Sequence, residues 1–258
     1  MLRAVVTLQK ATLYKKLMLP EERDAFIRNG ITHEQRGIEI APWFRPLAPK
    51  REGYNCLTID VFSKDDLLER AKNDVNIPKE SHALLEEVDF VGNATEIADL
   101  VPENIHGSFD YIISSHNFEH LPNPIKFLQG CEKVLKSDGK LIMAVPDQRA
   151  CFDYFRPHTT IAAWIEAYLE DRKKPTKRNI FEGQSSVAIY KSEKEQMHAF
   201  ALTHDPKNIF CTSSIKVVFN WLGPRELVHR GWDDFPIDKE NHHEKDEKDS
   251  GANHPDTA

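Results

Sequence analysis

Cysteine and long apolar runs are both scarce in this sequence of 258 residues. Its four cysteines include no C-x-x-C pair, which argues against a structural zinc site and indicates a reducing compartment. No apolar run approaches the roughly 20 residues that a membrane span requires. The apolar run within the N-terminal MLRAVVTLQK is too short for a signal peptide. We therefore expect no membrane span and a cytoplasmic location.

An excess of positive charge is also absent. The chain has 34 Lys and Arg against 41 Asp and Glu, a formal net charge of -7. A nucleic acid is therefore not an expected partner. The densest basic run, residues 172–178, is more typical of a solvated helix end or loop than of a phosphate site. The sequence does not indicate an oligomeric state.

The clearest structural pattern lies between Phe109 and Pro146. The apolar runs 111–113 and 141–145 predict two buried strands. Between them, Asn123–Pro124 predicts the start of a helix and Gly139 its left-handed stop. Strands joined by one helix are parallel and need a right-handed crossover, so this segment predicts half of an open α/β sheet.

The same alternation of short apolar runs and helical patterns extends upstream. Strands are predicted at residues 37–41, 56–59 and 88–91, and helices at residues 65–72 and 97–100. The whole pattern predicts an α/β fold with a doubly wound, mostly parallel, Rossmann-like sheet.

The organisation along the chain follows from these elements. Residues 1–35 are expected to be a helical segment and residues 36–147 the Rossmann-like core. Residues 148–237 would form an insertion or lid with the remaining sheet elements, and residues 238–258 a disordered acidic tail.

Within the third region, residues 160–171 predict a helix and residues 172–195 an irregular polar insertion. Residues 206–222 form an apolar periodic stretch, and residues 226–229 suggest one last strand. The apolar face of the helix at 160–171 would consist of Ile161, Trp164, Ile165 and Tyr168.

The motifs after residue 108 resemble those of class I S-adenosylmethionine-dependent methyltransferases. FDY enters a strand, HNFEHL follows it, and VLKSDG closes the helix, as in the family run "FD-strand, (L/I)EH, helix, vLkpGG, strand". The last strand continues as VPDQRACFD, like the VPD-x-R-x-x-FD segment of some methyltransferase-domain proteins. The resemblance covers about residues 36–157. It implies a seven-stranded, mostly parallel sheet with one reversed strand.

The resemblance also implies S-adenosylmethionine as the cofactor, held at the ends of the first four strands. Glu39 would be the acid of the first loop, with Ala41 allowing close approach of the backbone. Asp60, about 20 residues later, has the spacing at which a carboxylate accepts ribose hydroxyl groups.

The next two strand ends would complete the cofactor site. Asn93, with Ala94 beside it, would face the adenine. Ser115 and His116 would line the methionine part. Carboxyl ends of parallel strands meet at one edge of a sheet, which is where such sheets bind ligands.

The first loop departs from the family. It reads EIAPWFRP where the family usually has E/D-x-G-x-G-x-G, and every glycine is missing. Glycine permits positive φ and close backbone approach to a ligand. A degenerate, non-catalytic module with the cofactor-binding fold is therefore an alternative to an enzyme.

A second alternative comes from the spelling of residues 116–120, H-x-x-E-H, which one group of zinc peptidases uses. That chemistry needs both imidazoles on one helical face. A strand is predicted to end just before His116, and Pro122 disfavours a helix at Leu121. We therefore expect no metal and no zinc hydrolase.

The function predicted from these residues is transfer of the cofactor's methyl group to an oxygen or nitrogen of a small molecule. His116 is the first candidate for a catalytic base, because imidazole titrates near neutrality. Asp147, which follows the fifth strand, is the second candidate. Residues 148–205 would form the acceptor-binding lid, and the sequence does not identify the acceptor.

Overall fold

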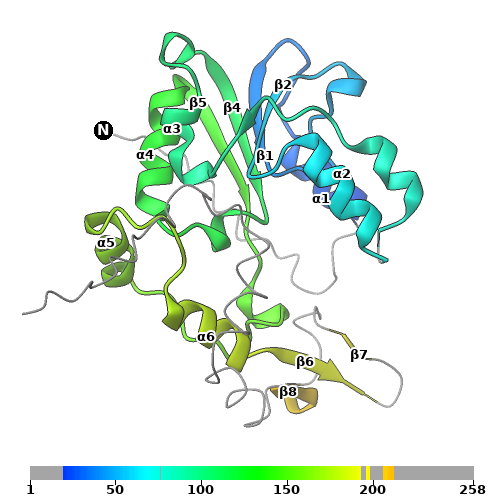
Figure 1. The fold of residues 1–258 in the computed structure, drawn as a ribbon, viewed down its shortest axis with the longest axis vertical. Coiled ribbons are helices and arrows are strands. Elements are labelled where there is room, and N and C mark those ends of the chain that lie inside the picture. Colours follow the sequence, from blue (N-terminus) through cyan, green and yellow to red (C-terminus); the bar gives the residue numbers. More distant parts are fainter. Residues whose placement is uncertain (1–19, 76, 193–195, 198–205, 212–258) are drawn as a thin grey trace, which may run out of the picture.

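A parallel sheet of five strands lies at the centre of the protein (Figure 1). The computed structural model describes residues 20–75, 77–192, 196–197 and 206–211. The strand order is β3-β2-β1-β4-β5, which confirms the predicted doubly wound, mostly parallel α/β fold. The strands are β1 (Arg36–Ile40), β2 (Asn55–Asp60), β3 (Phe90–Val91), β4 (Phe109–Ser115) and β5 (Leu135–Ala144).

Helices with clear capping signals connect and flank these strands. The helices are α1 (Pro20–Ile27), α2 (Lys64–Asn73), α3 (Ile97–Leu100), α4 (Pro124–Val134), α5 (Ile161–Leu169) and α6 (Lys177–Ser185). Ser63 and Asp66 form a capping box at the start of α2. The side chain of Asn123 accepts the Lys126 N–H at the start of α4, where Pro124 is the first residue.

Each face of the sheet carries its own apolar layer. On one face, Ile38 and Ile40 of β1 pack with the buried side of α4, including Phe127 and Val134. On the other face, Tyr111 and Ile113 of β4 pack against a second cluster. That cluster includes Ile27 of α1 and the buried residues Leu47, Ala48 and Cys56. Side chains alternate across a strand, so Glu39 lies on the face opposite Ile38 and Ile40.

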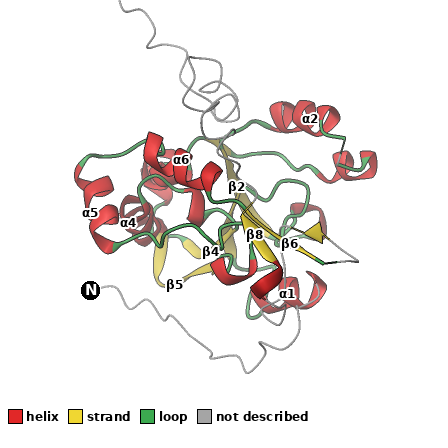
Figure 2. Ribbon diagram, turned by 90° about the horizontal axis from the view of Figure 1, so that it is seen from below, coloured by secondary structure: helices red, strands yellow, loops and turns green. Residues whose placement is uncertain are grey.

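A second, smaller sheet follows the core. It contains β6 (Ala188–Lys191), β7 (Gln196–Met197) and β8 (Ile209–Cys211), antiparallel in the order β7-β6-β8. Its buried residues Ala188 and Ile209 pack with Tyr154, and the Ala188 N–H donates to the Phe152 carbonyl oxygen at 2.7 Å. In Figure 1 this sheet and α6 lie below the five-stranded sheet, and in Figure 2, which is seen from below, they overlap that sheet in projection.

The prediction of an irregular polar insertion at residues 172–195 was wrong. The segment contains α6 and β6. The Thr176 and Asn179 side chains form a capping box at the start of α6, with the Asn179 N–H donating to the Thr176 hydroxyl at 3.1 Å. This local hydrogen bonding starts a helix that has few apolar residues, which is why hydrophobic periodicity did not reveal it.

The prediction around Gly139 was also wrong in two respects. Helix α4 ends at Val134, and β5 begins at the next residue, with a register shift opposite Phe109–Tyr111. Gly139 lies in β5, where an added Cβ would come within 2.9 Å of the Phe109 carbonyl oxygen. The strand is the last in the described sheet and is half-exposed rather than buried, with Met143 40% exposed.

Helix α5 confirms the helix predicted at residues 160–171, but its apolar face is largely exposed. Ile161 is 69% exposed and Ile165 is 47% exposed, whereas the Trp164 ring lies 5.7 Å from the Phe118 ring. The expectations for residues 212–222, 226–229 and 238–258 lie outside the described residues. Among the described residues, no helix is long and apolar enough to cross a bilayer.

The close contact between β1 and β4 gives a stability prediction. A Cβ added at Gly37 would lie 2.0 Å from the ring of Tyr111, which is 2% exposed and cannot swing into solvent. We expect Gly37→Ala to lower the free energy of unfolding by about 1–3 kcal/mol, the usual cost of overpacking a core. Urea denaturation followed by circular dichroism measures this change.

Gly183 provides the matched control for that substitution. It lies within α6, and an added Cβ would meet Arg156 only at 3.9 Å. Alanine is the better helix former, so Gly183→Ala should leave stability unchanged or raise it by up to about 1 kcal/mol. Equal effects of the two substitutions would show that the Gly37–Tyr111 contact does not constrain the sheet.

Candidate cofactor site at the sheet edge

The ends of the five strands bring the predicted site residues to one edge of the sheet in spatial order. Asn93 follows β3, Asp60 ends β2, Ala41 follows β1, Ser115 ends β4 and Asp147 follows β5. The chain reverses its direction of winding between β1 and β4, which is where open α/β sheets form a ligand crevice. Adjacent strands lie about 4.8 Å apart, so β3 to β4 spans roughly 14 Å.

The loop after β1 has positive φ at two residues, a conformation that glycine adopts most easily, although the loop contains no glycine. Ala41 has φ 49° and Trp43 has φ 53°. These left-handed values cost an L-residue roughly 1–2 kcal/mol each. The Ala41 N–H donates to the Ile59 carbonyl oxygen at 2.8 Å, and the Arg45 N–H donates to the Pro42 carbonyl oxygen at 3.1 Å. Surrounding hydrogen bonds therefore hold the strained conformation.

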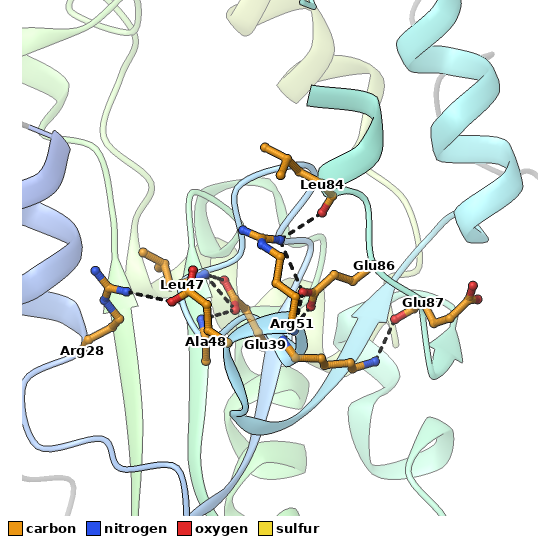
Figure 3. Close-up of polar contacts among 10 residues, drawn as sticks. Arg28, Glu39, Leu47, Ala48, Arg51, Leu84, Glu86 and Glu87 are labelled. Atoms are coloured by element: carbon orange, nitrogen blue, oxygen red, sulfur yellow. Dashed lines mark hydrogen bonds and ion pairs between the residues drawn. The ribbon is translucent and has the colours of Figure 1, made fainter. Parts of the chain in front are cut away.

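The carboxylate of Glu39 fixes the far end of this loop (Figure 3). Its Oε1 accepts the Leu47 N–H at 2.8 Å, and its Oε2 accepts the Ala48 N–H at 2.9 Å. Glu39 is 3% exposed, and burial raises its pKa to about 7 despite these two backbone donors. In the structure Glu39 braces the loop, and a direct contact with the cofactor stays a prediction.

A neighbouring set of polar contacts ties the next turn to the segment before β3 (Figure 3). The Lys50 N–H donates to the Glu86 carboxylate at 2.9 Å, and the Arg51 guanidinium donates to the Leu84 carbonyl oxygen at 3.2 Å. These bonds join residues more than 30 positions apart in sequence. The loop after β1 is therefore anchored at both ends.

Asp60 opens onto a cleft of about 770 Å³ next to this loop. The residues that line the cleft include Ala41 and Trp43 of the loop after β1, and Phe62 and Arg70 from the segment after β2. The Asp60 Oδ1 accepts the Phe62 N–H at 3.1 Å. Asp60 is 5% exposed, and burial raises its pKa to about 6. A carboxylate of this kind is suited to accept hydroxyl groups.

Asn93 and Ala94 start the short turn after β3. The Asn93 side chain accepts the Thr95 N–H at 2.9 Å, and Ala94 is 5% exposed. Asn93 therefore acts as a local cap in the structure. Its main chain lies at the same sheet edge as Asp60, because the Gly92 N–H donates to the Asp60 carbonyl oxygen at 2.8 Å. Neither Asn93 nor Ala94 lines the cleft that contains Asp60.

Beyond β4, His116 has a left-handed backbone with φ 53°, and its N–H donates to the Ala144 carbonyl oxygen at 2.9 Å. Its Nδ1 lies 3.7 Å from the Glu119 Oε1, and the His120 Nε2 lies 3.8 Å from the same oxygen. Partial burial disfavours the Glu119 carboxylate, but the His116 side chain, a backbone N–H and the neighbouring His120 together outweigh this effect and lower the pKa of Glu119. Sequence reasoning had not given Glu119 a role in orienting His116.

Asp147 is less suited to act as a base. Its carboxylate accepts two hydrogen bonds from the exposed Arg149 guanidinium, at 3.0 Å and 2.6 Å. This bidentate pairing lowers the pKa of Asp147. A carboxylate held in the charged form takes up a proton less readily, so the geometry favours His116 over Asp147.

The zinc hypothesis finds no supporting geometry. Residues 118–120 form a single 3-10 turn after β4 rather than a helix carrying His116 and His120 on one face. In the part of the chain that the structure describes, no group of three or more His, Cys, Asp or Glu side chains could hold a metal ion.

Part of the core is similar to a known family. Residues 42–143 match the model of a family described as "Methyltransferase domain". No curated protein is detectably similar to the chain in sequence.

Solved structures show low similarity. A chain from Galdieria sulphuraria, proposed to be a sarcosine dimethylglycine methyltransferase, has 18% identity and a TM-score of 0.31 over 45% of this chain and 43% of that chain. A SAM-dependent methyltransferase from Methanosarcina mazei has 15% identity and a TM-score of 0.34 over 76% of this chain and 81% of that chain. Scores this low leave the assignment resting on the family match and the topology.

The fold and the sheet edge thus define a Rossmann-like α/β protein with a ligand crevice at the carboxyl ends of its strands. Within that class, residues 42–143 are similar to a methyltransferase domain, and S-adenosylmethionine is the cofactor that this similarity implies. The residues present fit that group. A buried carboxylate and aromatic side chains line a cleft beside a loop held in left-handed conformations.

The brace formed by Glu39 gives a pH prediction. Its native pKa, about 7, exceeds the value near 4.3 of an unfolded glutamate. The native state therefore binds more protons between these values, and the Glu39 contribution to stability falls as pH rises from 5 to 8. We expect Glu39→Gln to be destabilising at pH 5, because the amide places a donor against a backbone N–H. The destabilisation should be smaller at pH 8, where Glu39 itself contributes less to stability.

Urea denaturation of both proteins at pH 5 and pH 8 measures this difference. Glu103→Gln, at an exposed position, is the control and should show no such change with pH. A stability difference between wild type and Glu39→Gln that stays constant from pH 5 to pH 8 would contradict the raised pKa.

Proposed function

We propose that this chain is a methyltransferase that transfers the methyl group of S-adenosylmethionine to a nucleophile on a small molecule. The observation that carries the proposal is the buried carboxylate of Asp60 in a cleft beside the left-handed loop after β1. The family match over residues 42–143 supports the same assignment. When bound, the cofactor supplies an activated methyl group on a sulfonium leaving group.

Each strand end has a part in holding that group. Asp60 would accept the ribose hydroxyls, and Ala41 would leave room for the backbone to approach. Asn93 and Ala94 would lie on the adenine side, and Ser115 and His116 on the methionine side. The protein's main contribution is to align two bound reactants, which is worth roughly 7–11 kcal/mol of the barrier.

A base is needed only where the acceptor must lose a proton during transfer. His116 is the proposed base, because its side chain is 54% exposed at the methionine end of the sheet edge and lies beside Glu119. Asp147 remains the second candidate, weakened by its pairing with Arg149. Residues 148–205, which include α5, α6 and part of the second sheet, are proposed to bind the acceptor.

Asp60 makes cofactor binding sensitive to pH. If only the carboxylate form binds the ribose, a pKa of about 6 reduces affinity about tenfold at pH 5 relative to pH 8. Calorimetry with S-adenosylhomocysteine should show this loss. Asp60→Asn should bind at least tenfold more weakly at pH 8 and lose the pH dependence, because the amide cannot accept two hydroxyl groups.

Asp65→Asn is the matched control, because Asp65 is exposed on α2 outside the cleft lining. It should retain wild-type affinity and the wild-type pH profile. Wild-type protein that binds no S-adenosylhomocysteine at any pH would support the degenerate, non-catalytic module instead.

The role of His116 is tested by separating binding from transfer. With labelled S-adenosylmethionine and a pool of small-molecule alcohols, phenols and amines, His116→Ala should lower the rate of label transfer by about 10²–10⁴-fold. Its affinity for S-adenosylhomocysteine should fall far less. Transfer at the wild-type rate by His116→Ala would remove this residue from the chemistry, and Asp147→Asn would then be the next variant.

A further inference from the structure

Trp43 is an aromatic residue in a loop where methyltransferases of class I usually have glycine. Trp43 has φ 53° and is only partly buried. A bulky side chain in a left-handed conformation is uncommon and is often associated with function. The strain needs an explanation, because a glycine would adopt this backbone freely.

The position of the Trp43 indole explains this strained backbone. Trp43 lines the cleft that contains Asp60. One part of the ring system packs with Phe44, at 5.9 Å between ring centroids, and against the buried cluster that includes Leu67 and Ala71. The ring is therefore held in place while part of it stays accessible to a ligand.

Phe62 and Arg70 add a second flat surface to the cleft. The Arg70 guanidinium lies over the Phe62 ring at 3.7 Å, and both residues line the cleft. Asp60, at the end of β2, lines the same cleft. Flat apolar surfaces next to a buried carboxylate suit a ligand with a planar base and hydroxyl groups, which is the chemistry of a nucleoside.

We propose that Trp43 binds the nucleoside part of the ligand through its indole face, and that this contact replaces the backbone approach that glycines provide in related loops. The inference rests on the proposed function, because the nucleoside in question is that of S-adenosylmethionine. The left-handed backbone of Trp43 directs the chain so that the indole reaches the Asp60 cleft. The residue thus determines affinity for the base.

The experiment uses S-adenosylhomocysteine and adenosine as probes of the full-length chain. The sequence has four tryptophans, so intrinsic fluorescence can report on Trp43. Both probes should change the emission of wild-type protein. Trp43→Phe should abolish most of the change, whereas Trp164→Phe, on α5, should preserve it.

Affinity measured by calorimetry gives the second readout. Trp43→Leu keeps an apolar side chain in the packed cluster but removes the stacking face. We expect it to weaken both probes by the same factor, about 10- to 100-fold, within the range for loss of one base–aromatic stack. Phe44→Leu, in the same loop and cluster, should change either affinity by less than threefold.

The outcomes separate this inference from the proposed function. If wild-type protein binds neither probe, the proposed function fails. If wild type binds both probes and Trp43→Leu, folded by circular dichroism, binds them equally well, the role of Trp43 is overturned while the function stands. A loss of affinity for S-adenosylhomocysteine without a loss for adenosine would also overturn it, because the contact would then lie outside the nucleoside.

Discussion

The site depends on two hydrogen bonds that the buried Glu39 carboxylate accepts from the backbone N–H groups of Leu47 and Ala48. Burying a carboxylate costs several kcal/mol, and hydrogen bonds to a charged group return roughly 1.5–3 kcal/mol each. The raised pKa indicates that burial outweighs the bonds. The carboxylate ties down the far end of the loop in which Ala41 and Trp43 have left-handed backbones.

Much of the core was predictable because local signals agreed with the global fold. The strands β1, β2 and β4 have short, mostly apolar runs, and the start of α4 at Asn123–Pro124 has the cap and proline expected there. Helix α6 was missed because its signal is a capping box rather than apolar periodicity. The burial of β5 was mispredicted because burial depends on which strand covers its outer edge, and local sequence does not contain that information.

The site was predictable only to the level of the sheet edge. Strand order places Asn93, Asp60, Ala41 and Ser115 along one line, as the pattern of polar strand ends indicated. The sequence could not show that Glu39 turns away to bind its own loop, because that depends on which backbone N–H groups return to β1. It also could not show that the Arg149 guanidinium donates a hydrogen bond to the Asp147 carboxylate.

The loop after β1 also bears on how such proteins are detected. A search pattern that demands glycines after the first strand would pass over this chain, although its main chain has positive φ at Ala41 and Trp43, as glycine permits. A more direct signature of this loop is an acidic residue two positions before the first left-handed residue, as Glu39 stands before Ala41. Its carboxylate accepts backbone N–H groups at the other end of the loop, as Glu39 does from Leu47 and Ala48. Divergent members of large enzyme families could be recognised by the brace even where the flexible residues have been replaced.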